Sequence, residues 1–113
     1  MARRRVTVPT PRRGEIWLAD LDKRRPVVVL TRNPMGRILQ SVIVGPVTST
    51  VRGLSTEVEL GDADGMRRRS VVNLDNLQLL PRSRLVRQVG RATAANMRLI
   101  CDAVAQAVAC AAR

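Results

Sequence analysis

The functional group that dominates this sequence of 113 residues is the guanidinium of arginine. The chain holds 20 basic residues against 9 acidic ones, for a formal net charge of +11, and every basic residue except Lys23 is Arg. A guanidinium binds phosphate through two parallel hydrogen bonds, so this excess indicates a polyanionic partner, with nucleic acid ahead of an anionic membrane surface. The alternative is a GC-rich genome, whose codons favour Arg, Ala, Val and Gly without a functional reason.

The residue types that are missing exclude several kinds of site. The absence of His excludes His–Cys zinc sites and His-based general acid–base catalysis. Trp17 is the only aromatic residue, which argues against RNA binding on stacked aromatic side chains, as in RRM or cold-shock domains. Cys101 and Cys110 lie on one predicted helix, roughly 13–14 Å apart along its axis and on opposite faces, so they cannot bridge each other. We therefore expect no metal and no other cofactor.

Short apolar runs between turn residues predict a series of strands that would carry these Arg side chains. Turn signals lie at residues 20–22 and 33–36, and residues 61–65 form a loop. Proline is expected at the first position of the second strand, where a missing N–H can be spared, and the third strand is expected to bend near Gly45 and Pro46. The predicted strands are residues 15–18, 26–30, 39–47, 56–60, 70–74, 77–80 and 86–90.

The hydrophobic period changes to that of a helix from Thr93 to about Ala112. Thr93 is a good N-cap, although Asn96 stands where a full capping box has Glu or Gln. One apolar stripe is predicted to face the core: Met97, Ile100, Cys101, Val104 and Val108. The whole pattern predicts an α+β, mostly β fold, a small barrel or curled sheet with a packed C-terminal helix.

The chain is predicted to form a single domain over residues 13–113, preceded by an Arg-rich, mobile arm over residues 1–12. The arm could grip RNA backbone, be a solvated tail, or result from a start assigned too far upstream. It lacks the apolar segment of a signal peptide, and no apolar run in the chain approaches the length of a membrane span. We therefore expect a cytoplasmic protein that does not enter a membrane.

Five motifs in order resemble the toxins of the MazF/PemK family of bacterial toxin–antitoxin systems. Each motif is weak alone, but their order along nearly the whole chain, residues 13–108, is specific. The motifs are Arg13-Gly14-Glu15-Ile16-Trp17 with Asp20-Leu21, Arg24-Arg25-Pro26-Val27-Val28-Val29-Leu30, Val42-Ile43-Val44-Gly45-Pro46-Val47-Thr48-Ser49, Ser70-Val71-Val72-Asn73-Leu74-Asp75-Asn76-Leu77 and Val89-Gly90-Arg91.

The resemblance implies an SH3-like barrel, the fold shared with the CcdB gyrase poisons, that assembles as a homodimer. It implies a toxin that inhibits translation and growth as a metal-independent, sequence-specific endoribonuclease of single-stranded RNA. Attack by the ribose 2′-OH would leave a 2′,3′-cyclic phosphate and a 5′-OH. A cognate antitoxin with an acidic and apolar tail would neutralise it.

The resemblance also implies two catalytic residues, Arg25 before the second strand and Thr48 at the end of the third. A fixed guanidinium can bond two of the phosphate oxygens that gain charge during in-line attack, and a threonine hydroxyl can donate to the phosphate or orient the 2′-OH. From the residues alone, Arg25 could equally be a solvated surface charge, and Thr48 a strand-end residue that bonds local backbone. The sequence shows no carboxylate beside this pair, so the general base is not identified.

Further residues flank the two motifs and are candidates for RNA binding. Lys23, Arg24 and Arg52 could hold phosphates or be solvated charges, and Ser49 and Thr50 could contact base edges or end the strand. The run Arg67-Arg68-Arg69 could bind RNA or an acidic antitoxin tail, or form a solvated loop.

The chain departs from the family between Asp20 and Arg25, where many relatives carry a longer loop that helps to choose the RNA sequence. The target sequence, and whether it lies in mRNA, tRNA or rRNA, is therefore left open. A non-catalytic basic barrel that binds nucleic acid and a degenerate toxin are the alternatives. A gyrase poison is disfavoured, because the C-terminal residues Ala-Cys-Ala-Ala-Arg contain no Trp.

Overall fold

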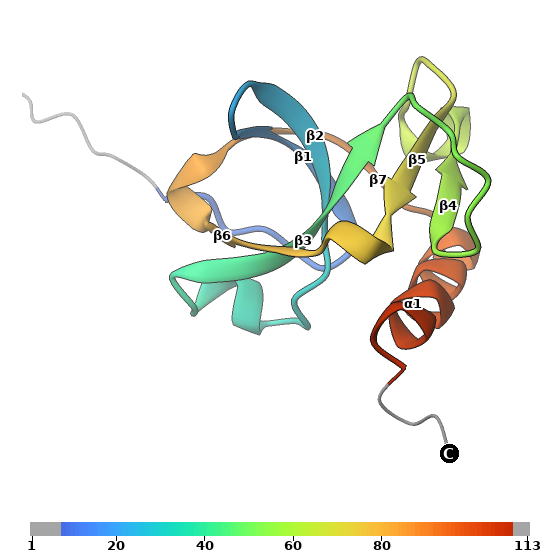
Figure 1. The fold of residues 1–113 in the computed structure, drawn as a ribbon. Helices are drawn as coiled ribbons and strands as arrows, with labels where there is room; N and C mark the ends of the chain where they lie inside the picture. Colours follow the sequence, from blue (N-terminus) through green and yellow to red (C-terminus); the bar gives the residue numbers. More distant parts are fainter. Residues whose placement is uncertain (1–7, 110–113) are drawn as a thin grey trace, which may run out of the picture.

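The computed structural model describes residues 8–109, which fold into seven strands and one helix (Figure 1). Four 3-10 turns connect them: η1 (Met35–Arg37), η2 (Asp62–Asp64), η3 (Leu74–Asn76) and η4 (Arg82–Arg84). The predicted α+β, mostly β class with a C-terminal helix is confirmed. The regular elements are β1 (Glu15–Asp20), β2 (Arg24–Val29), β3 (Ser41–Thr48), β4 (Glu57–Leu60), β5 (Ser70–Asn73), β6 (Gln78–Pro81), β7 (Leu85–Arg91) and α1 (Ala94–Val108).

The third strand, β3, joins two parts of a curled antiparallel sheet. The strand order is β4-β5-β3-β2-β1-β7, and β6 pairs with β3 outside this path. Residues 41–44 of β3 pair with β6 and residues 44–46 with β2, whereas Val47 and Thr48 pair with β5. The predicted bend at Gly45 and Pro46 lies where the partner changes. A Cβ at Gly45 would lie 2.9 Å from Val72, so glycine lets β5 approach β3 closely.

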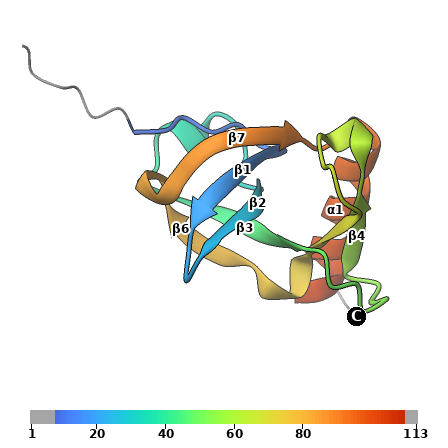
Figure 2. The same ribbon diagram turned by 90° about the horizontal axis from the view of Figure 1, so that it is seen from above.

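Two apolar cores lie on opposite faces of β2 and β3, because successive side chains of a strand point to opposite faces. Val28 and Val47 enter the core that packs under α1, whereas Val27, Val29 and Val44 enter the second core. Seen from above, α1 and β4 lie at one end of the molecule, and β1, β2, β3, β6 and β7 curl around the other (Figure 2). Trp17 packs partly against the second core, as expected for a packing residue.

The second strand begins two residues earlier than predicted, at Arg24, so Pro26 does not stand at its first position. Pro26 lies opposite Leu18 of β1, whereas pairing with β3 starts only at Val27. At Pro26 the strand therefore has a partner on one side, which tolerates a residue without an N–H. This start places Arg25 inside the strand.

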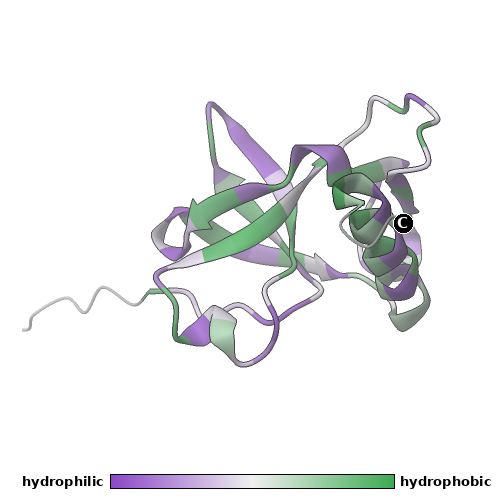
Figure 3. Cartoon of the chain, turned by 60° about the horizontal axis from the view of Figure 1, so that its bottom comes forward, coloured by the Kyte–Doolittle hydropathy of each residue, from purple (hydrophilic) through white to green (hydrophobic). Residues whose placement is uncertain are grey.

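The N-terminus of α1 is capped as predicted, since the hydroxyl of Thr93 accepts a hydrogen bond from the backbone N–H of Asn96 at 3.1 Å. The apolar stripe is only partly correct. Ile100 is buried and Met97 and Val104 pack against the first core, but Cys101 is exposed. Figure 3 shows hydrophilic and hydrophobic segments alternating along the helix.

The helix turns a different face to the core than predicted at its C-terminal end. Ala103 is buried there, whereas Val108 is exposed. The helix ends at Val108, followed by Ala109 with a φ of 50°. Cys110 and the last predicted turn lie outside the described residues.

Part of the predicted N-terminal arm packs on the domain. Residues 1–7 lie outside the described residues, but Pro11 is fully buried, and Arg82 Nη1 donates a hydrogen bond to the carbonyl of Pro9 at 3.1 Å. A Cβ at Gly36 would lie 2.7 Å from the carbonyl oxygen of Pro11, so this segment fits closely against η1. Residues 9–11, which were predicted to belong to a mobile arm, therefore contact the domain.

Candidate functional site

Strands β2 and β3 part at one end, and Arg25 and Thr48 both line the opening. Their register runs from Val29 opposite Val44 to Val27 opposite Pro46. Continued by two residues, it would set Arg25 opposite Thr48, but Thr48 pairs with Val71 of β5 instead. Because β3 leaves β2 for β5 here, side chains rather than backbone pairs line the space between the two strands.

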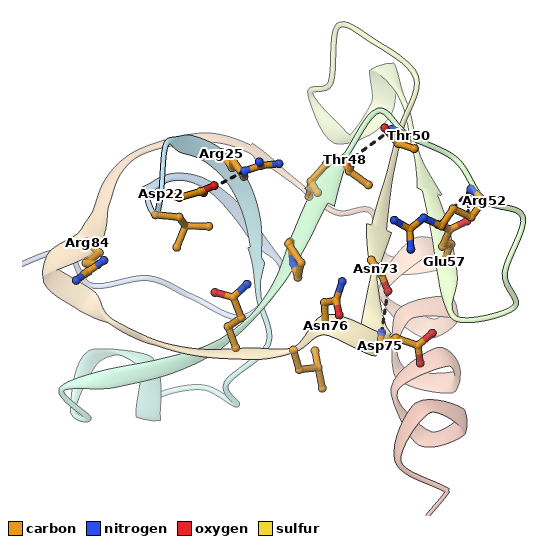
Figure 4. Close-up of a pocket in the computed structure, with 15 residues that line it drawn as sticks. Asp22, Arg25, Thr48, Thr50, Arg52, Glu57, Asn73, Asp75, Asn76 and Arg84 are labelled. Atoms are coloured by element: carbon orange, nitrogen blue, oxygen red, sulfur yellow. Dashed lines mark hydrogen bonds and ion pairs between the residues drawn. The ribbon is translucent and has the colours of Figure 1, made fainter.

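A first cleft with a volume of about 930 Å³ opens at this fork (Figure 4). Its walls come from the β1–β2 turn, β2, the end of β3, the loop before β4, and the segment from β5 to β6. The loop before β4 and the η3 turn therefore bring residues far along the chain into the same cleft as Arg25. The lining residues are Leu21, Asp22, Arg25, Pro46, Val47, Thr48, Thr50, Arg52, Glu57, Asn73, Asp75, Asn76, Leu77, Gln78 and Arg84.

Arg25 is half-buried and is held by a carboxylate from the preceding turn. Its Nε lies 3.4 Å from Oδ1 of Asp22, the same oxygen that accepts the backbone N–H of Lys23. The hydrogen bond from Lys23, and then the charge of Arg25, lower the pKa of Asp22 below its ordinary value. The Nη atoms of Arg25 make no hydrogen bond to the other residues from 8 to 109, so two donor groups remain available for a ligand.

Thr48 ends β3 with its hydroxyl fixed by the next turn. Its Oγ1 accepts the backbone N–H of Thr50 at 3.1 Å. That bond uses a lone pair and leaves the hydroxyl hydrogen free to be donated. The local backbone contact that the sequence offered as an alternative role for Thr48 is therefore present, and it is compatible with donation to a ligand.

Three carboxylates line the first cleft, which corrects the expectation that none stands beside this site. Asp22 contacts Arg25 directly. Glu57 Oε1 accepts the backbone N–H groups of Arg52, Gly53 and Leu54 at 2.9–3.2 Å, so it shapes the loop before β4. Asp75 accepts the hydroxyl of Thr56. Sequence spacing could not find these groups because loop and turn geometry alone brings them together.

Three side-chain amides in the cleft were not singled out as site residues. Asn73, Asn76 and Gln78 come from the end of β5, the η3 turn and the start of β6. An amide both donates and accepts hydrogen bonds, which suits the edge of a nucleobase. The signal was present, since Asn73 and Asn76 belong to the motif that carries the resemblance.

The predicted RNA-binding residues divide into two groups. Thr50 and Arg52 line the first cleft, and Ser49 lines a second, smaller cleft that also includes Arg25 and Thr48. Lys23 and Arg24 line neither cleft. Arg24 is exposed and pairs with Asp20 at 3.1 Å on the β1–β2 hairpin.

Among residues 8–109, no group of three or more His, Cys, Asp or Glu side chains is arranged to hold a metal ion. Within the same residues, α1 is too short and too polar to cross a membrane, and no other α-helix is present.

A family of known proteins matches residues 12–108: the PemK-like, MazF-like toxins of type II toxin–antitoxin systems. The chain is 43% identical over 103 residues to a probable endoribonuclease MazF5 of Mycobacterium tuberculosis, covering 88% of this chain and 94% of the relative. It is 42% identical over 92 residues to the endoribonuclease MazF3 of the same organism, covering 81% and 89%.

Solved structures share the fold at similar coverage. The M. tuberculosis toxin MazF-mt6 aligns with a TM-score of 0.81 at 41% identity, over 84% of this chain and 96% of that one. A mycobacterial endoribonuclease in complex with its cognate antitoxin aligns with a TM-score of 0.82 at 30% identity, over 88% and 96%. The small barrel with a C-terminal helix is thus the fold of both proteins.

Proposed function

The chain belongs to the family of PemK-like, MazF-like toxins of type II toxin–antitoxin systems, and we propose that it cleaves RNA in the first cleft with Arg25 and Thr48. Its homologues are endoribonucleases, and this chain is an endoribonuclease of the same family. The observation that carries the proposed site is the fork between β2 and β3, which sets Arg25 and Thr48 on facing strands of one cleft.

Arg25 stabilises the charge that develops on phosphorus. When the 2′-oxygen attacks, the P–O2′ bond forms and the P–O5′ bond breaks, and negative charge accumulates on the equatorial oxygens. The Asp22 contact occupies Nε of Arg25, which leaves both Nη groups to bond those oxygens. The 2′-OH loses its proton as it attacks and the leaving 5′-oxygen takes up a proton, so the products are a 2′,3′-cyclic phosphate and a 5′-OH.

Thr48 donates its hydroxyl hydrogen to the same phosphate or to the 2′-OH. The bond from the Thr50 N–H fixes the rotamer, so the hydroxyl needs little reorganisation when RNA binds. Fixed donors that meet developing charge are worth most in such a preorganised site.

The toxin acts with three further features that the family supplies. We propose that it is a homodimer, that it works in the cytoplasm without a metal, and that a cognate antitoxin neutralises it. The antitoxin complex of the mycobacterial relative supports the last point, and the net charge of +11 favours an acidic partner segment. The mass in solution, with and without antitoxin, tests the homodimer.

The test of the proposed site is cleavage of total RNA by the purified protein in EDTA, with sequencing of the new 5′ ends. We expect discrete 5′-OH ends at one short motif. Arg25→Ala and Thr48→Ala should each abolish detectable cleavage, Arg25→Ala costing about 10²–10³ in rate, while RNA affinity falls only modestly.

Arg87→Ala and Thr10→Ala are the matched controls, because both residues are exposed and line neither cleft. They should cleave at the wild-type rate. Wild-type rates in the Arg25 and Thr48 variants would refute the site assignment. Cleavage only with added metal would refute the proposed mechanism, and a folded dimer that binds RNA without cutting it would support the non-catalytic alternative.

A further inference from the structure

The run Arg67-Arg68-Arg69 lies between η2 and β5. Arg69 forms an ion pair with Glu59 of β4. Arg67 and Arg68 are exposed, and neither has an ion-pair partner among residues 8–109. Two guanidinium groups beside the proposed active site therefore form no ion pair within the described residues.

Arg67 and Arg68 line a second cleft of about 410 Å³ that meets the first at Arg25 and Thr48. The shared residues of the two clefts are Arg25, Val47 and Thr48. The second cleft therefore continues the first past the proposed catalytic pair. Its remaining lining residues are Pro26, Ser49, Met66 and Ser70.

The two clefts differ in charge. The first holds three carboxylates, three guanidinium groups and three amides, so its formal charges balance. The second holds Arg25, Arg67 and Arg68 and no carboxylate. A balanced surface rich in amides suits the neutral, hydrogen-bonding edge of a base, whereas an all-positive surface suits the phosphate backbone.

The segment that carries these arginines is anchored at both ends. Before it, the buried carboxylate of Asp64 accepts hydrogen bonds from the N–H of Thr93 at 2.8 Å and from the Asn96 amide, which fixes η2 to the start of α1. After it, the hydroxyl of Ser70 donates to the carbonyl of Arg68 at 3.1 Å as β5 begins. A loop fixed at both ends loses less conformational entropy when it binds a ligand.

We propose that the second cleft is a phosphate-binding subsite, in which Arg67 and Arg68 hold the RNA backbone on one side of the scissile bond. RNA is favoured over an acidic antitoxin segment because the second cleft is continuous with the catalytic pair. A strand whose scissile phosphate lies at Arg25 must extend from it along the second cleft or along the first. The proposal rests on the proposed function, since it places the scissile phosphate at Arg25.

The test uses Arg67→Gln/Arg68→Gln and, as a charge-matched control, Arg87→Gln/Arg98→Gln, whose residues are exposed and line neither cleft. The probe is an RNA oligonucleotide spanning the cleavage motif, with a 2′-O-methyl group at the scissile nucleotide to prevent cleavage. Its Kd is measured from 50 to 400 mM salt. Loss of two phosphate contacts should reduce the magnitude of the slope of the logarithm of the binding constant against the logarithm of the salt concentration by about 1.4.

Cleavage of the unmodified RNA provides the second readout. The Arg67/Arg68 variant should raise KM about tenfold at 150 mM salt with kcat within about twofold of wild type, because the contacts hold RNA equally in the ground and transition states. The difference should vanish for a substrate shortened on the side that occupies the second cleft. The control variant should leave KM and the salt slope unchanged.

Several outcomes would overturn the proposal. A wild-type KM and salt slope in the Arg67/Arg68 variant, or an equal loss in the control, would show that the cleft makes no specific phosphate contact. Normal RNA binding with weakened antitoxin binding would assign the surface to the antitoxin. Failure of the proposed function is distinguished separately, because salt-dependent binding of the uncleavable RNA reports on Arg67 and Arg68 even if the protein cuts nothing.

Discussion

Asp64 and Asp22 both accept hydrogen bonds at a turn, but they differ in burial and in the partners that they bind. Asp64 is 2% exposed, and its two oxygens accept bonds from Gly61, Thr93 and Asn96. Asp22 has a side chain that is 76% exposed and uses one oxygen for Lys23 and Arg25. The cluster around Asp64 joins η2 to α1, whereas the cluster around Asp22 borders the first cleft.

The difference lies in which groups remain unused. Around Asp64, the backbone N–H groups and the amide of Asn96 all find their partners inside the fold. At the fork, the Nη atoms of Arg25 and the hydroxyl hydrogen of Thr48 are not used by the other described residues. Polar groups satisfied within the fold stabilise it, and polar groups held in position but left open are available to a substrate.

Removing the buried carboxylate should produce the largest effect on stability. Asp64→Ala leaves the N–H groups of Gly61 and Thr93 and the Asn96 amide without acceptors, so we expect a loss of about 3–5 kcal/mol in the free energy of unfolding. Urea denaturation measures this loss. Asp62→Ala is the control, since Asp62 is an exposed neighbour in η2 and should change stability by less than about 0.5 kcal/mol.

The folded fraction of Asp64→Ala should cleave RNA with the wild-type kcat, because Asp64 lines neither cleft. A large fall in kcat at a denaturant concentration where the variant is folded would contradict the separation between the two clusters.

Arg25→Lys should also have a large effect on activity, though a smaller one than Arg25→Ala. Lysine keeps the charge but not the planar fork, so one ammonium cannot bond two phosphate oxygens while Asp22 holds it. We expect kcat to fall by about 10²-fold with no measurable loss of stability, as judged by thermal melting. Arg87→Lys serves as the control on β7. Full activity in Arg25→Lys would show that charge alone is required.

The sequence predicted the elements well because local chemistry defines them. Thr93 was recognisable as an N-cap, and the alternation in Thr56 to Leu60 matched a strand with one buried face, since Val58 and Leu60 are buried and Glu59 is exposed. The toxin family followed from the order of motifs, and the family match over residues 12–108 confirms it, while the likeness to solved MazF toxins confirms the fold class.

The site was only partly predictable, because its other members meet through long-range geometry. Asp22, Glu57 and Asp75 line the same cleft as Arg25 from three segments, and nothing in their spacing indicates it. The role of Asn96 was hidden similarly: it departs from the usual capping residue because its amide bonds Asp64, 32 positions earlier in the chain. Local patterns carry no information about such partners.

Asp22→Asn should have a smaller effect that separates a positioning role from a proton-transfer role. We expect kcat to fall by up to about tenfold, because the neutral amide holds Arg25 less well. The pKa of Asp22 is lowered, so its carboxylate stays ionised at neutral and mildly acidic pH. The ion pair between Asp22 and Arg25 is therefore lost only as pH falls through that lowered pKa. The ratio of wild-type to variant kcat should therefore be constant from about pH 5 to pH 8. If Asp22 accepts the proton of the 2′-OH, hydroxide should replace it increasingly in the variant as pH rises, and the ratio should fall with pH in this window.

Ala109→Gly, at the C-terminal end of α1, should have the smallest effect. Ala109 follows α1 with φ 50° and ψ 32°, a left-handed conformation that glycine adopts without the Cβ penalty. The backbone N–H of Ala109 donates to the carbonyl of Ala105 at 2.8 Å, and this cap survives the substitution. We expect a gain of about 0.5–1 kcal/mol in the free energy of unfolding, measured by urea denaturation, with unchanged KM and kcat on RNA. Asp64→Ala should lower the free energy of unfolding and Ala109→Gly should raise it. A constant kcat across both variants would show that the fork between β2 and β3 keeps its geometry however tightly α1 is held. A kcat that changed with stability would instead show that α1 supports the active site.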